Sequence, residues 1–165
     1  MRAPENLRKA GRQVTANPGA PGVDGMTSED CPACAREPWP SIRPAGREER
    51  YQPSPGRRTE IPQRHGQGKR RLGIPTGVER VIQQAIAQVL GPIVDPEFCA
   101  SSGGFRPGRS AHQAVRQLQG YSKAGAKVAV ALDLAKFFAR VNHDALMTRV
   151  ARRVRDKALL RLIGP

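Results

Sequence analysis

The stretch that decides the fold is Thr76-Gly-Val-Glu-Arg-Val-Ile-Gln-Gln-Ala-Ile-Ala-Gln-Val-Leu90. Its apolar residues recur every three or four positions, as they do on one face of an α-helix. Thr76 can cap the first turn, Glu79 stands where a capping box needs its acidic residue, and Gly91-Pro92 is expected to stop the helix. The sequence therefore predicts a helix whose continuous apolar face is formed by Val78, Val81, Ile82, Ala85, Ile86, Val89 and Leu90.

Two short segments before this helix predict a basic hairpin. Arg57-Arg-Thr-Glu-Ile61 and Lys69-Arg-Arg-Leu-Gly-Ile74 lie on either side of a turn at His65-Gly-Gln-Gly68. Earlier still, residues 1–50 show little apolar periodicity and several proline and glycine turn signals. We therefore expect that segment to be loop-rich and loosely ordered.

Beyond the first helix, the pattern changes from helix to strand. Ser110, with Gln113 in the capping-box position, predicts a second helix that turns three apolar residues inward: Ala114, Val115 and Leu118. From Lys127 to Leu134 apolar residues alternate, which predicts a strand covered on both faces.

Two further helices are expected from about Asp144 and from about Asp156. Together these elements indicate an α+β fold with a single core strand. Because a lone strand cannot form a sheet, we expect a truncated fold that lacks its sheet partners. Such a chain is expected to show a helical spectrum without a cooperative thermal transition, and to bind a hydrophobic dye.

The charge of the chain favours a polyanionic partner. Its 165 residues include 28 Lys and Arg against 14 Asp and Glu, a formal net charge of +14. On charge alone RNA, DNA and an anionic membrane surface all remain open. No apolar run of about 18 residues predicts a membrane span, and no apolar segment near the start resembles a signal peptide. We therefore expect a cytoplasmic protein without a membrane partner.

Three local features could carry chemistry. Cys31-Pro-Ala-Cys34 is a C-x-x-C pair, but a structural zinc needs four suitably spaced ligands, so two loop thiols are the favoured interpretation. Asp133 stands at the end of the apolar strand. There a carboxylate pairs with Lys136 or Arg140, forms a strand-end turn, or binds a cation. The neighbouring Phe137 and Phe138 are either core residues or a wall for a nucleotide sugar.

Six blocks along the chain then carry a family resemblance. They are Pro21-Gly-Val-Asp-Gly-Met-Thr27, Tyr51-Gln-Pro-Ser-Pro55, Gly68-Lys-Arg-Arg-Leu-Gly-Ile-Pro-Thr76, Val81-Ile-Gln-Gln-Ala-Ile86, Gly104-Phe-Arg-Pro-Gly-Arg-Ser-Ala-His112 and Leu132-Asp-Leu-Ala-Lys-Phe-Phe-Ala-Arg-Val-Asn-His-Asp144. In this order and spacing they resemble the group II intron reverse transcriptases (maturases), over roughly residues 17–163.

The resemblance implies the fingers and the beginning of the palm of an RNA-directed DNA polymerase. It divides the chain into a loop-rich extension (1–50), a basic fingers region (51–110) and the start of the palm (111–165), ahead of a Tyr-x-Asp-Asp block. The implied partners are a template or intron RNA, a DNA primer and deoxynucleoside triphosphates, and the implied cofactor is Mg²⁺.

The resemblance also implies roles for single residues. Asp133 is the catalytic residue and binds Mg²⁺ together with the backbone carbonyl of Leu134. Phe138 lies under the incoming sugar and excludes a 2′-hydroxyl, whereas Arg70 and Lys69 contact the triphosphate. The residues implied in RNA binding are Arg57, Arg58, Arg71, Arg106 and Arg109.

The chain also departs from the family pattern. Alanines stand at 131, 135 and 139, where the family usually has acidic residues, and no Tyr-x-Asp-Asp block is present. Since one carboxylate cannot hold two metal ions, we expect this chain to be inactive by itself. A non-catalytic RNA-binding module and a decayed reading frame remain alternative interpretations.

Overall fold

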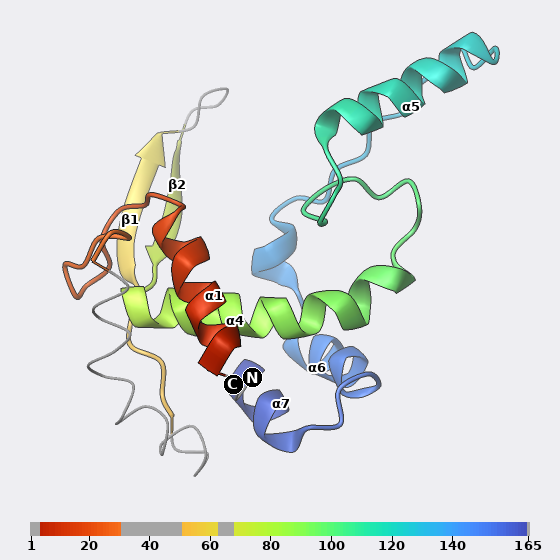
Figure 1. Cartoon of the computed structure of the whole chain (residues 1–165). Coiled ribbons are helices and arrows are strands. Elements are labelled where there is room, and N and C mark those ends of the chain that lie inside the picture. The colour runs from red at the N-terminus through yellow and green to blue at the C-terminus, as the bar shows by residue number, and fades with distance from the viewer. Residues whose placement is uncertain (1–3, 31–50, 63–67, 165) are drawn as a thin grey trace. The chain divides into compact units, whose positions relative to one another are not determined.

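The computed structural model describes residues 4–30, 51–62 and 68–164 (Figure 1). The chain divides into two compact units. The first is Met1–Gly91 with Val154–Pro165, and the second is Pro92–Arg153. Cys31 and Cys34 lie outside the described residues, as does most of the predicted hairpin turn. The borders predicted at residues 50/51 and 110/111 concern regions of the family and stay predictions.

The helices and strands of the described residues have the following bounds. The first unit holds α1 (Pro4–Thr15), β1 (Arg57–Pro62), β2 (Lys69–Ile74), most of α4 (Gly77–Val94) and α7 (Lys157–Ile163). The second unit holds the end of α4, the 3₁₀ turn η1 (Asp95–Glu97), α5 (Ala111–Lys123), the 3₁₀ turn η2 (Phe137–Arg140) and α6 (His143–Ala151).

The core of the first unit forms where α1 lies across α4 (Figure 1). The packed cluster there consists of four buried residues with Leu7 against them: Ala10, Val14, Val81 and Ala85. Ile82, Val154 and Leu159 are also buried in this unit. The side-chain amide of Asn6 donates to the carbonyl oxygen of Ala85 at 3.1 Å, and Gln84 donates to Gln13 at 2.8 Å. The expectation of a loop-rich segment is therefore wrong for residues 4–15, because the apolar face of α4 gives this short amphipathic helix a surface to bury.

The helix α4 is longer than predicted. It continues through Gly91-Pro92 and ends at Val94, so the predicted stop is wrong. Proline removes one backbone donor but does not forbid a helix that is otherwise held by its neighbouring turns. The predicted cap is present in part. The Glu79 N–H donates to Thr76 Oγ1 at 3.3 Å, whereas the buried Glu79 carboxylate accepts from the Ser54 N–H.

The segment around Pro21–Thr27 is bound to the start of α4. Asp24 accepts the Gly77 N–H at 2.9 Å with one carboxylate oxygen and the Met26 N–H at 3.3 Å with the other. A Cβ on Gly22 would lie 2.7 Å from the carbonyl oxygen of Pro75, so only glycine permits this approach. Asp24 thus supplies a negative charge at the positive end of the helix.

The basic hairpin is confirmed. β1 pairs with β2 in antiparallel register, with Glu60 opposite Arg71 and Ile61 opposite Arg70. This is the one sheet within the described ranges, and it has two strands.

The predicted strand at Lys127–Leu134 is wrong for the structure of this chain. These residues form neither helix nor strand, and the side chains of Val128 and Leu132 are 82 % and 93 % exposed. The sheet within the described ranges consists of β1 and β2 alone, so these residues pair with neither strand, and an isolated strand is not stable by itself.

The later helices begin where predicted. Ser110 and Gln113 form the reciprocal capping box of α5, and Asn142 and Asp156 cap α6 and α7. The inward face predicted for α5 is wrong, however, since Val115 and Leu118 are both more than half exposed. None of the helices that the structure describes is long and apolar enough to cross a membrane.

Candidate functional site

Asp133 is exposed to solvent in the second unit. Its Oδ1 accepts the backbone N–H of Leu134 at 2.9 Å. This local hydrogen bond restricts the carboxylate without burying it. Among the described residues it forms no ion pair with Lys136 or Arg140, so the salt-bridge interpretation is not supported. The carboxylate is therefore accessible to an external cation.

The two phenylalanines that follow are also accessible. They begin η2, which Lys136 enters in the left-handed backbone region with φ at 53°. Their rings meet edge to face, 5.4 Å between centroids, and Phe138 is 84 % exposed. The core interpretation of this pair is wrong. Asp133 and Phe138 are five positions apart and together expose a carboxylate and an aromatic face.

The cations of the hairpin point in two directions. Side chains alternate along a strand, so Lys69 and Arg71 share one face of the hairpin and Arg70 lies on the other. The structure therefore does not bring Lys69 and Arg70 together on one face. Arg57 and Arg58, also exposed, are divided between the faces in the same way.

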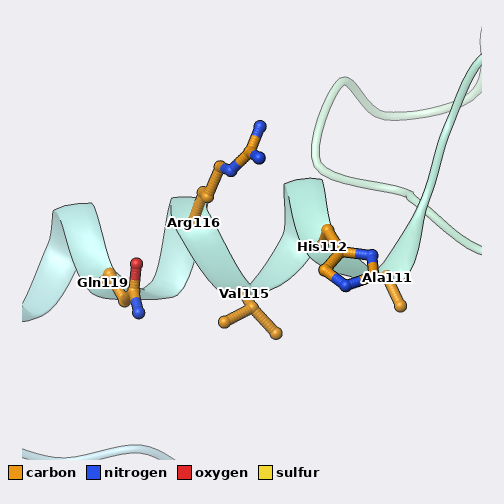
Figure 2. A pocket seen from close by; sticks show the side chains of 5 residues that line it. All are labelled: Ala111, His112, Val115, Arg116 and Gln119. Atoms are coloured by element: carbon orange, nitrogen blue, oxygen red, sulfur yellow. The ribbon is translucent and has the colours of Figure 1, made fainter.

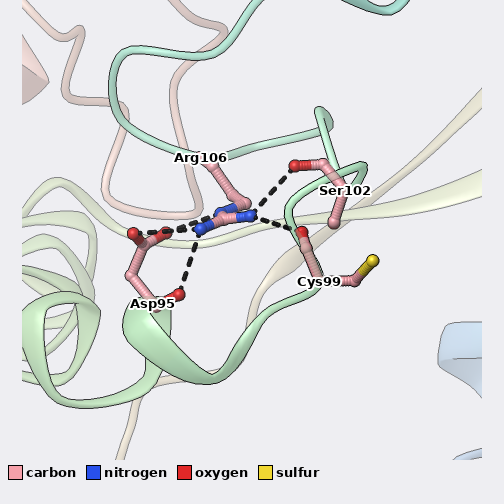
Figure 3. Close-up of polar contacts among 4 residues, drawn as sticks. All are labelled: Asp95, Cys99, Ser102 and Arg106. Atoms are coloured by element: carbon pink, nitrogen blue, oxygen red, sulfur yellow. Dashed lines mark hydrogen bonds and ion pairs between the residues drawn. The ribbon is translucent and has the colours of Figure 1, made fainter.

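Arg106 is held within its own loop, as Figure 3 shows. It donates to the Asp95 carboxylate at 2.8 Å and to the carbonyl oxygens of Cys99 and Ser102 at 2.9 and 3.1 Å. Its side chain is only 9 % exposed, and its guanidinium lies over the ring of Phe98. These donors hold the loop together, so we expect Arg106 to have a structural role in place of the RNA contact implied for it.

Replacing Arg106 by alanine should loosen this loop and leave RNA affinity almost unchanged. The hydrogen bond from Arg106 lowers the pKa of Asp95, so the pair stabilises the loop at neutral pH and is lost only as the pH falls below the ordinary aspartate range. Limited proteolysis should cut residues 95–106 faster in Arg106→Ala than in the exposed control Arg109→Ala. A loss of RNA affinity in Arg106→Ala with unchanged cleavage would restore Arg106 as an RNA contact.

A hollow of about 330 Å³ lies along α5 (Figure 2). All the residues that line it belong to that one helix: Ala111, His112, Val115, Arg116 and Gln119. It contains no carboxylate or thiol. Nor does any group of three metal-ligating side chains gather elsewhere in the part of the chain that the structure describes.

Three features near the hairpin are not predicted by the sequence analysis. Glu79 was predicted only as a helix cap, yet its buried carboxylate also fixes Ser54, the residue ahead of the hairpin. Burial, aided by the charge of Glu79, raises the pKa of Tyr51. Glu60 forms ion pairs with both Lys69 and Arg71, which cross-strand register could have indicated once the hairpin was recognised.

Comparison with known proteins identifies the family of the chain. The family model described as reverse transcriptase (RNA-dependent DNA polymerase) matches residues 61–162. Protein YkfC of Escherichia coli strain K12 is 35 % identical over 166 residues, covering 97 % of this chain and 43 % of that protein. The group II intron-encoded protein LtrA of Lactococcus lactis subsp. cremoris is 29 % identical over 160 residues, covering 97 % of this chain and 26 % of its own length.

A more distant relative is nuclear intron maturase 1, mitochondrial, of Arabidopsis thaliana. It is 29 % identical over 89 residues, which is 54 % of this chain and 12 % of that protein. The chain thus spans less than half the length of each of these three relatives.

Proposed function

Since this chain belongs to the reverse transcriptase (RNA-dependent DNA polymerase) family, we propose that it supplies the fingers hairpin and the start of the palm to a group II intron reverse transcriptase. The observation that carries this proposal is the extent of the family match. It begins at Ile61 inside the hairpin, ends beyond α6, and encloses Asp133 and Phe138. The proposed reaction is the template-directed transfer of deoxynucleotides to a primer.

In this proposal Asp133 is one of the carboxylates that hold Mg²⁺, the cofactor generally used by the family. The carboxylate of this exposed residue and the neighbouring Leu134 carbonyl are hard oxygen ligands of the kind Mg²⁺ prefers. Within the described ranges, however, no group of three metal-ligating side chains forms around them. A two-ion centre does not fit this residue set alone, so Asp133 requires further palm carboxylates before it can act.

Phe138 is proposed to lie against the sugar of the incoming nucleotide. Its ring is exposed and is set at its angle by the edge-to-face contact with Phe137. A rigid ring in that place leaves no room for a 2′-hydroxyl, which favours deoxynucleotides.

The hairpin is proposed to contact polyanions, namely RNA and the nucleotide triphosphate. Each contact between a cationic side chain and a phosphate releases counterions. Five residues of the hairpin are cationic and exposed: Arg57, Arg58, Lys69, Arg70 and Arg71. A second candidate function, RNA binding without catalysis, is favoured by the same hairpin together with the single carboxylate. Both candidates require the hairpin to bind RNA, and only the first requires Asp133.

RNA binding is tested by the salt dependence of affinity. Alanine at Lys69, Arg70 and Arg71 together should make the slope of log affinity against log salt shallower by up to about 2, at roughly 0.7 for each full phosphate contact on a single strand. At 0.1 M salt this corresponds to a loss of affinity of up to roughly 100-fold. The matched control removes three exposed cations elsewhere: Arg152, Arg155 and Lys157.

The control should change the slope much less than the hairpin variant does, because its cations are not proposed to meet phosphate. Fluorescence anisotropy of a labelled single-stranded RNA between low and moderate salt measures both slopes. An unchanged slope in the hairpin variant would move the RNA site away from β1 and β2.

A further inference from the structure

The pairing register of the hairpin separates its charges into two sets. We call the face that bears Arg58, Glu60, Lys69 and Arg71 the outer face; Pro62 and Gly73 complete it. The opposite face bears Arg57, Thr59, Ile61, Arg70, Leu72 and Ile74. On that opposite face Thr59, Leu72 and Ile74 are partly buried, whereas every residue of the outer face is exposed.

Glu60 occupies the centre of the outer face. Its Oε2 lies 3.5 Å from the Nζ of Lys69, and its Oε1 lies 3.7 Å from the Nε of Arg71. One carboxylate therefore engages two cations at once. Both cationic side chains remain 70 % exposed, so an external anion can still reach them.

We infer that the outer face binds the sugar–phosphate backbone of single-stranded RNA, and that Glu60 limits this binding by competing with phosphate for Lys69 and Arg71. The inference rests on the proposed function for its assumption of an RNA partner. It adds to that proposal the face of the hairpin that contacts RNA and the residue, Glu60, that limits the affinity for RNA.

The spacing of the outer face suits a chain of phosphates. Lys69 and Arg71 are two residues apart on one strand, which places them about 6.7 Å apart. That separation is similar to the distance between neighbouring phosphates along a single strand. Across the hairpin, Arg58 faces Gly73, and the space that a side chain on Gly73 would fill is open. A third phosphate could reach Arg58 through this space.

The chemistry of the outer face indicates backbone contact without base recognition. It presents no aromatic side chain on which a base could stack. Its donors are lysine and arginine groups, which bind phosphate without regard to sequence. Arg70 projects from the other face and remains available for a separate anion, such as a nucleotide triphosphate.

Competition by Glu60 follows from exposure. Exposed ion pairs are weak because water and salt screen them, so phosphate can displace the carboxylate. Displacing the Glu60 carboxylate nevertheless lowers the net binding free energy of the RNA, because each phosphate must replace an existing ion pair. Replacing Glu60 by the similar but neutral glutamine should release both cations for phosphate.

The test compares Glu60→Gln with Glu97→Gln in the full chain, using labelled oligouridylate as the probe. Glu97 is a matched control because it also pairs with an arginine, Arg153, at 2.6 Å on an exposed surface. Glu60→Gln should bind about 5- to 25-fold more tightly at 0.1 M salt, with a slope steeper by about 0.7 to 1.4, as expected for one or two additional contacts. Glu97→Gln should change affinity less than about twofold.

A second arm tests whether Glu60 acts through its two partners. In a chain that already carries Lys69→Gln and Arg71→Gln, adding Glu60→Gln should no longer raise affinity, because no competed cation remains. A gain that persists there, or an equal gain from Glu97→Gln, would show only a net-charge effect and overturn the inference.

The outcomes also separate this inference from the proposed function. If the alanine variant of Lys69, Arg70 and Arg71 weakens RNA binding but Glu60→Gln does not strengthen it, the hairpin binds RNA and the competition is refuted. If neither variant changes RNA affinity, both are refuted.

Discussion

Amide hydrogens in the middle of α4 will exchange with deuterium at least about 100-fold more slowly than those of residues 128–134. The α4 amides are hydrogen-bonded within the helix, and Val81 and Ala85 are buried against α1. Residues 128–134, in contrast, belong to no helix or strand, and their apolar side chains are exposed. Hydrogen–deuterium exchange followed by mass spectrometry on the full chain measures both segments together.

The same exposure should make the chain bind a hydrophobic dye. The dye is expected to bind exposed apolar side chains of the second unit. Five of these side chains are more than three-quarters exposed: Phe105, Val128, Val130, Leu132 and Phe138. Slow exchange at residues 128–134, with no dye binding, would contradict this prediction. It would show that the predicted strand does pair in solution, for example with a second copy of the chain.

Elements governed by local interactions could be predicted from the sequence. The hairpin follows from two short strand patterns around a turn. The helix α5 follows from its capping residue Ser110, and α6 and α7 begin near the predicted Asp144 and Asp156. The body of α4 follows from its apolar period. In each case the residues that define the element lie within a few positions of one another.

Features that depend on distant contacts could not be predicted in the same way. The first helix was missed because Leu7, Ala10 and Val14 form too short a pattern without the surface of α4. The binding of Asp24 to the start of α4 joins positions 53 residues apart. Conversely, the alternation at 127–134 predicts a strand from neighbouring residues alone. Such a pattern carries no information about whether a partner strand is present.

The candidate site shows the same division. Residue types around Asp133 and Phe138 indicated polymerase chemistry only through the family resemblance, since their local patterns also fitted a salt bridge and a core. Among the arginines, sequence could not separate Arg106, whose donors are used within its loop, from the exposed Arg109. That Lys69 and Arg70 lie on opposite faces of the hairpin follows from the pairing register of β1 and β2.

Primer extension by a chimera will test the role of Asp133. In the chimera, the full 165-residue chain replaces the matching segment of a group II intron reverse transcriptase that extends primers by itself. The host then supplies the further palm carboxylates that Asp133 requires. Asp133→Asn should slow primer extension by about 100-fold or more, because it removes a charged ligand from the reacting centre. Asp144→Asn, an exposed carboxylate on α6, is the matched control and should leave the rate nearly unchanged.

Primer extension, measured in parallel for the chain alone, the chimera and its two variants, tests the central claim most directly. The expected result is no extension by the chain alone, extension by the chimera, and its loss in Asp133→Asn without loss of RNA affinity. Equal extension by the chimera with and without Asp133→Asn would contradict the claim. So would a chimera that binds RNA as its host does but extends no primer while Asp133 is intact.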